Sequence, residues 1–184
     1  MYVVLGVLVG ALLYCVWIAT TYILSDYVYT VNDIERRYAL RILSITNTKE
    51  KYALQKNGID RFIYHNFLKN ELHHTKEENI RLVKAEITVL AKSNAINKLY
   101  LACTCETEEV KELQKLVCEE YENACIVYGG WNVNDNPDAL KEMSNCDAVI
   151  LVEQIGISLH ENIRHFIGFC DQNEIPVLGS IVVR

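Results

Sequence analysis

Proline, clustered basic residues and low-complexity runs are all scarce in this sequence of 184 residues, and each absence excludes a class of protein. Only two prolines occur, and no segment has the biased composition that is typical of disordered chains. The net charge is -6, and the basic residues are scattered apart from Arg36, Arg37 and Arg41. Because nucleic-acid binding needs a concentrated basic surface, nucleic acid is not expected as a partner. The length is sufficient for one domain with its own core.

Regularly spaced cysteines are also absent. The seven cysteines are an odd number and most of them sit within apolar runs, which argues against a disulfide framework and favours reduced thiols in a cytoplasmic domain. Cys103 and Cys105 have the residue type of metal ligands. However, no second pair follows at the spacing of a zinc site, and His73 and His74 do not complete one convincingly. We therefore predict no metal ion and no other cofactor.

Charged side chains are missing from Tyr2 to Leu24. This length is about what one helix needs to cross a bilayer, so a transmembrane helix is predicted in residues 1–25. Gly6 and Gly10 have the GxxxG spacing that allows close helix packing. A signal peptide would have a basic start and a shorter apolar core, and a buried core helix is the other alternative. Because basic residues follow the run but do not precede it, the prediction is a single-pass protein of the cell membrane with a cytoplasmic C-terminal body.

Helices and apolar strands alternate through the rest of the chain. Residues 26–74 are expected to form a juxtamembrane helix, capped by Asn32 or Asp33, then a strand over 41–46 and a connector. Residues 75–184 are expected to form an α/β domain, with strands at 98–104, 124–128, 148–152 and 177–183. Its helices are predicted to begin at the capping boxes Thr75–Glu78 and Ser158–Glu161 and at the pair Asn136–Pro137. The pattern predicts a parallel sheet covered by helices on both faces, a three-layer α/β domain.

A phosphate-binding loop would follow the strand at 98–104 in many such proteins, but its residues are missing. Glycines and a lysine would be needed there. The chain instead has Thr104, Cys105, Glu106, Thr107, Glu108 and Glu109. Gly129 and Gly130 stand where a magnesium-binding aspartate is expected, although a tight turn after the strand explains them equally well. The motifs GxSxG, HExxH and GxGxxG are absent too. We predict a degenerate nucleotide-binding domain with no catalytic, cofactor-binding or metal-binding residue.

Two segments resemble known proteins of polysaccharide export. "YTVNDIERRYALRILSI" is similar to the segment after the second membrane span of the Wzz-like polysaccharide chain-length determinants, which include the capsule tyrosine kinase modulators. The matching residues are Thr30, Asp33, Ile34, Glu35, Ile42 and Leu43. The C-terminal half resembles the tyrosine autokinase fold that is fused to or partnered with these proteins. Its matching residues are Asp147, Val149, Leu151, Val152, Gly156 and Ser158, and then Ile175, Pro176, Val177, Leu178 and Gly179.

The resemblance implies a part in capsular, exopolysaccharide or lipopolysaccharide-type biosynthesis and chain-length control. The uncharged N-terminal run, the basic residues after it and the missing phosphate-loop residues predict that this part is a non-catalytic, membrane-anchored regulatory or scaffold subunit. Its expected partners are the lipid bilayer and a tyrosine kinase, polymerase or copolymerase subunit, with a homo-oligomer as a further option. The first span and the extracytoplasmic domain of the family do not precede Met1, so either a split or truncated member or an internal start site is expected. The alternative is a membrane-associated P-loop ATPase or protein tyrosine kinase with an unconventional phosphate loop.

Overall fold

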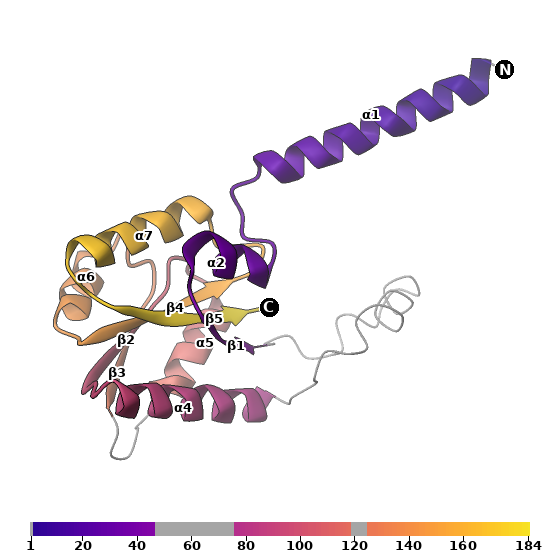
Figure 1. Ribbon diagram of the computed structural model, residues 1–184. Helices are drawn as coiled ribbons and strands as arrows, with labels where there is room; N and C mark the ends of the chain where they lie inside the picture. The colour runs from indigo at the N-terminus through magenta and orange to yellow at the C-terminus, as the bar shows by residue number, and fades with distance from the viewer. Residues whose placement is uncertain (1, 47–75, 119–124) are drawn as a thin grey trace.

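The computed structural model describes residues 2–46, 76–118 and 125–184 (Figure 1). Helix α1 (Tyr2–Leu24) extends away from the α/β body in Figure 1, and side chains such as Leu12 and Trp17 are exposed on it. Across the three described ranges, no helix combines the length and the apolar character that crossing a membrane requires. The transmembrane helix predicted for residues 1–25 therefore has no support from the structure.

A parallel sheet forms the centre of the body, as predicted, and it has five strands because the strand of the juxtamembrane segment joins it. Its strands are β1 (Ile42–Thr46), β2 (Lys98–Ala102), β3 (Ile126–Gly130), β4 (Ala148–Gln154) and β5 (Val177–Val183). They lie in the order β1-β5-β4-β2-β3, and every neighbouring pair is parallel. The edge strand β1 comes from the juxtamembrane segment and pairs with β5, so this segment contributes to the same sheet as the rest of the domain.

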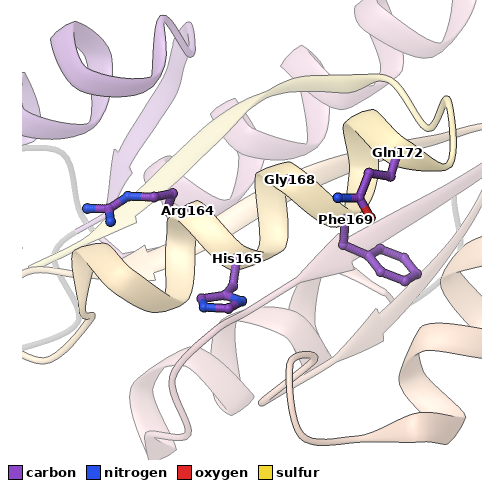
Figure 2. Close-up of a pocket in the computed structure, with 5 residues that line it drawn as sticks. All are labelled: Arg164, His165, Gly168, Phe169 and Gln172. Atoms are coloured by element: carbon purple, nitrogen blue, oxygen red, sulfur yellow. The ribbon is translucent and has the colours of Figure 1, made fainter.

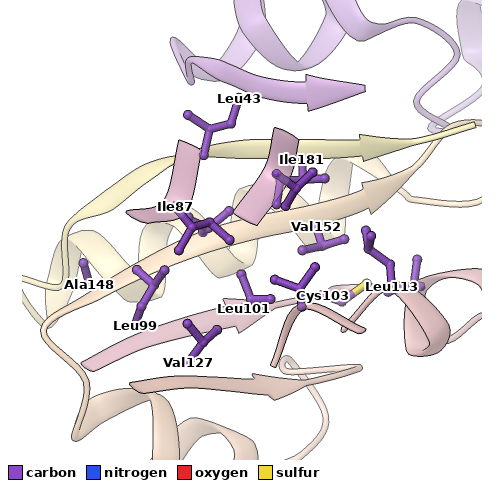
Figure 3. Close-up of a cluster of buried hydrophobic side chains, with 14 of the residues drawn as sticks. Leu43, Ile87, Leu99, Leu101, Cys103, Leu113, Val127, Ala148, Val152 and Ile181 are labelled. Atoms are coloured by element: carbon purple, nitrogen blue, oxygen red, sulfur yellow. The ribbon is translucent and has the colours of Figure 1, made fainter. Parts of the chain in front are cut away.

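Helices cover both faces of the sheet, which gives the predicted three layers (Figure 1). One face carries α4 (Lys76–Ser93) and α5 (Glu108–Val117), and the other carries α2 (Val31–Tyr38), α6 (Pro137–Ser144) and α7 (His160–Gln172). Successive strand residues supply the two cores because side chains alternate across a sheet. Leu99 and Leu101 of β2 pack with Ile87 in the first core (Figure 3). Tyr100 of β2 packs with Phe166 in the second core.

The helix starts differ in part from the predicted ones. Asn136 caps α6 and Pro137 occupies its first turn, as predicted. The cap of α2 is Thr30 rather than Asn32 or Asp33, because the Thr30 hydroxyl accepts from the Asp33 amide while the Asp33 carboxylate accepts from the Thr30 amide. The capping residue predicted at Thr75 and the strand start predicted at 124 lie outside the described residues.

The order of the strands creates a switch point at the carboxyl ends of β2 and β4. From β2 the chain passes through α5 to the edge strand β3, and then returns through α6 to β4 on the other side of β2. The connections after β2 and β4 therefore diverge to opposite faces of the sheet. In open α/β sheets, ligands bind in the crevice at such a point, so the loops that follow β2 and β4 define the candidate site.

Candidate functional site

A buried carboxylate occupies the switch point. Glu153, near the end of β4, is fully buried and accepts two hydrogen bonds from Thr104 in the loop after β2. The Thr104 amide donates to Oε1 at 3.1 Å, and the Thr104 hydroxyl donates to Oε2 at 2.8 Å. Sequence reasoning missed Glu153. An acidic residue that continues the apolar run of a predicted central strand was the available signal, because buried charges are rare unless they have partners.

Two cysteines complete a compact cluster with this carboxylate. The Sγ atoms of Cys103 and Cys105 lie 3.4 Å apart, and the Cys103 thiol donates to the Cys105 carbonyl at 3.0 Å. The ligand atoms of both cysteines and of Glu153 all lie within 4.8 Å of one another, and all three residues are buried. The Ser158 hydroxyl, from the loop after β4, donates to Cys105 Sγ at 3.4 Å. We call the trio Cys103, Cys105 and Glu153 the switch-point cluster.

Burial sets the protonation of this cluster. Desolvation, reinforced by the nearby Cys105 sulfur, raises the pKa of Glu153 above its ordinary value. Desolvation also raises the pKa of Cys103. The hydrogen bond from the Cys103 thiol lowers the pKa of Cys105, because it stabilises the thiolate.

The acidic residues beside α5 do not cap the helix. The cap is Thr107, whose side chain accepts from the Val110 amide. Glu108 and Glu109 lie in the first turn, where negative charge is favourable to the helix dipole. Lys111 pairs with Glu106 at 2.8 Å and with Glu108 at 3.5 Å.

The two glycines at the position of the degenerate metal site have a packing role within β3, and they do not form the tight turn that was the alternative interpretation. Gly129 and Gly130 are the last two residues of β3 and pair with Leu101 and Ala102 of β2. A Cβ at Gly130 would collide with the Tyr100 hydroxyl, so that ring occupies the space of the missing side chain. Gln114 of α5 donates to the carbonyls of Leu101 at 3.0 Å and Gly130 at 3.1 Å.

The segment after α1 is attached to the same edge of the sheet. Tyr27 pairs with Leu159, the Val28 amide donates to the Ser158 carbonyl at 2.9 Å, and the Gly156 amide donates to the Val28 carbonyl at 2.8 Å. The predicted cap at Ser158 is wrong, because its hydroxyl accepts from the Gln154 amide instead. Residue Leu159 occupies the N-cap position of α7 without a side-chain hydrogen bond.

A buried histidine joins α2 to α7 nearby. The Tyr38 hydroxyl lies 2.9 Å from His160 Nδ1 and 2.9 Å from the His160 carbonyl. Burial lowers the pKa of His160 below its ordinary value of 6.5, and the neighbouring Arg37 lowers it further. The other charged groups that act on the ring are Asp33, Asp26 and Arg164. These contacts join the end of α2 to the start of α7.

A depression on the outer surface of α7 is not part of this edge (Figure 2). It has a volume of about 400 Å³ and is lined by Arg164, His165, Gly168, Phe169 and Gln172. Within the described parts of the chain, all five lining residues come from one helix. The switch-point cluster remains the stronger candidate site.

Comparisons with known proteins support the fold and go no further. No protein family and no curated protein matches the sequence. Among solved structures, the BceF tyrosine kinase domain matches with a TM-score of 0.51 and 9% sequence identity, covering 85% of this chain and 98% of that chain. The fold resembles that of a tyrosine kinase domain. The chimerical protein CapA2B2 matches with a TM-score of 0.41 and 12% identity, covering 84% and 99% of the two chains.

Proposed function

We propose that this protein is a non-catalytic docking subunit, anchored at the cell membrane, that serves capsular or exopolysaccharide synthesis and its chain-length control. The observation that carries the proposal is the hydrogen bond from the Thr104 amide to the buried carboxylate of Glu153. A phosphate loop depends on backbone amides that are free to point at the anion. In this chain the amide of Thr104, at the start of the loop, already donates to the carboxylate of Glu153.

The charges around the loop also oppose a nucleotide. Glu106 and Glu108 are exposed beside it, and the side chain of Lys111 is already paired with both. Two like charges about 4 Å apart repel by roughly 4 kcal/mol at an effective dielectric constant of 20. A triphosphate would meet several such charges, and tyrosine kinases need Mg²⁺-ATP.

Exposed apolar side chains at the same edge suit protein docking. Trp131 follows β3 and is 41% exposed, Ile157 follows β4 and is 44% exposed, and Tyr27 of the attached segment is 45% exposed. Exposed aromatic side chains are typical of protein interfaces. The partner proposed for this edge is a tyrosine kinase, a polymerase or a copolymerase subunit of the same pathway.

The membrane location is part of the proposal and rests on the uncharged sequence of residues 1–25 together with the basic residues that follow it. Exposed apolar side chains on α1, among them Leu12 and Trp17, are consistent with contact to lipid. Alkaline carbonate washing of isolated membranes tests the location. Release of the full chain into the wash would refute the anchor and leave the docking proposal standing.

The similarity in fold to a tyrosine kinase domain favours one alternative, an ATPase or tyrosine kinase with an unconventional phosphate loop. Calorimetric titration of the full chain with Mg²⁺-ATP separates the two functions, with an active kinase domain of similar fold as the positive control. The docking proposal expects no heat of binding, and micromolar affinity would refute it.

Docking itself is tested by co-purification of the full chain with a tyrosine kinase, a polymerase and a copolymerase of capsular polysaccharide synthesis. Trp131→Ala should weaken capture of the partner. Ile126→Ala is the matched control, because Ile126 is an exposed apolar residue at the amino end of the same strand. Equal capture by both variants would place the interface elsewhere.

A further inference from the structure

The switch-point cluster brings together three metal-binding side chains that the sequence separates by up to fifty positions. Cys103 and Cys105 follow β2, and Glu153 lies at the end of β4. Their ligand atoms all lie within 4.8 Å of one another, and none of the three residues is more than 8% exposed. Among the residues that the structure describes, this is the one group of three or more such side chains placed to hold an ion. The search for zinc-type spacing in the sequence could not find it, because the third ligand is distant in the chain.

We propose that Cys103, Cys105 and Glu153 bind one zinc ion. Two sulfur ligands and one carboxylate are a donor set that suits zinc and excludes the hard cations calcium and magnesium, which take oxygen ligands. Donors of a tetrahedral zinc ion, with bonds of about 2.0–2.3 Å, lie roughly 3.3–3.8 Å apart. The two sulfur atoms, 3.4 Å apart, are already within this range. The carboxylate reaches it by a shift of about 1 Å.

The surroundings of the cluster supply the support that a metal site needs. Thr104 donates two hydrogen bonds to the Glu153 carboxylate, which hold it in place and offset part of its charge. Two thiolates and a carboxylate bring three negative charges, so the cluster with bound zinc has a net charge of -1. The fourth ligand comes from a water molecule or from the Ser158 hydroxyl, which lies 3.4 Å from Cys105 Sγ.

Zinc at this position joins the loop after β2 to the end of β4. Open α/β sheets bind their ligands at the switch point. In this chain the ligand at that position is a cation rather than a phosphate. The site is independent of docking, because it concerns buried side chains rather than the exposed residues of the edge. Its role is structural: it fixes the loop that begins at Cys103.

Cobalt substitution in the full chain tests the site. The protein is reduced, stripped of metal with a chelator, and titrated with Co²⁺, whose thiolate complexes absorb in the near ultraviolet. We expect the absorption to saturate at one ion per chain and to disappear when Zn²⁺ is added. Cys105→Ser should weaken zinc affinity by roughly 100-fold, and Glu153→Gln by about 10-fold or more. Cys125→Ser is the matched control, because Cys125 has the same 8% exposure as Cys105 and lies outside the cluster.

A second measurement uses the unmodified chain, so a variant that fails to fold leaves the proposal testable. Bound zinc should slow the alkylation of Cys105 and leave the alkylation of Cys125 unchanged, as read by peptide mass spectrometry. Absence of cobalt absorption, its persistence in Cys105→Ser, or equal alkylation with and without zinc would each overturn the proposal. A disulfide between Cys103 and Cys105 in chain freshly isolated from cells would overturn it as well.

Discussion

The N-terminus of α7 depends on a carboxylate that lies 135 positions earlier in the chain. Asp26 Oδ2 accepts from the Glu161 amide at 3.0 Å, and the Asp26 carbonyl accepts from the His160 amide at 2.7 Å. Leu159, at the N-cap position, provides no side-chain hydrogen bond. Asp26, in the segment after α1, therefore caps α7 in place of a local residue. The substitution Asp26→Ala removes the carboxylate that accepts this hydrogen bond.

Two contributions set the loss of unfolding free energy that we expect for Asp26→Ala. Loss of a capping oxygen costs about 1 kcal/mol, and loss of a negative charge at a helix N-terminus costs about 0.3–1 kcal/mol. Because Asp26 is exposed, solvent screens the charge and the lower part of that range applies. We expect Asp26→Ala to lower the free energy of unfolding by about 1–1.5 kcal/mol. Asp26→Asn keeps an oxygen acceptor and should lose only about 0.3–0.5 kcal/mol.

Two measurements on the full chain in mild detergent test the cap. Urea unfolding gives the free-energy loss, and hydrogen exchange over residues 156–163 shows where it arises, with exchange about tenfold faster in Asp26→Ala for a loss of about 1.4 kcal/mol. Asp138→Ala is the matched control for the charge alone, because Asp138 is also exposed and lies in the first turn of α6, where its carboxylate pairs with Lys141. Unchanged exchange at Glu161 in Asp26→Ala would refute the reasoning.

Three further perturbations test the core and the helix contacts. Gly179→Ala would place a Cβ 2.5 Å from the Arg41 carbonyl oxygen. Urea unfolding should therefore show a free energy of unfolding lower by about 1–3 kcal/mol, with faster hydrogen exchange in β1. Wild-type stability would contradict the pairing of β1 with β5. Phe166→Ala empties a fully buried position and should cost about 3–5 kcal/mol in the same assay. His160 has a lowered pKa, so the folded state binds fewer protons than the unfolded state just below pH 6.5, and stability should fall as pH drops through 6.5. His160→Asn should remove that part of the pH dependence, and identical slopes for both proteins would exclude the histidine.

Sequence reasoning succeeded where the structure depends on local periodicity. The strand predicted at 177–183 has the same bounds as β5, and the predicted cap of α6 at Asn136 is the observed one. Continuous apolar runs mark central strands because both faces of a parallel sheet are buried. Burial of all seven residues of β4 follows the same rule.

It failed where distant segments meet. Ser158 has the sequence signature of a capping residue, but Asp26 provides the cap from another part of the chain and leaves the Ser158 hydroxyl to the Gln154 amide. Gly129 and Gly130 suggested a turn, yet the buried ring of Tyr100 needs the space that a side chain at Gly130 would fill. Each of these outcomes depends on a contact between residues that no local pattern connects.

The candidate site also depends on a residue that is distant in the sequence, and this residue changes the chemistry expected for the loop after β2. From the sequence, the loop after β2 was a phosphate loop without its glycines and lysine, and the glutamates in the loop were a further reason to expect no nucleotide. The structure adds Glu153, which takes the Thr104 amide and lies beside two thiols. A phosphate site presents hydrogen-bond donors to an anion, whereas this edge presents acceptors and sulfur atoms toward its own interior. Acceptors and sulfur atoms at the switch point, in place of hydrogen-bond donors, explain why ATP is not expected to bind there. They also explain why a cation is proposed there. A zinc-loaded chain that also bound Mg²⁺-ATP would contradict this common explanation.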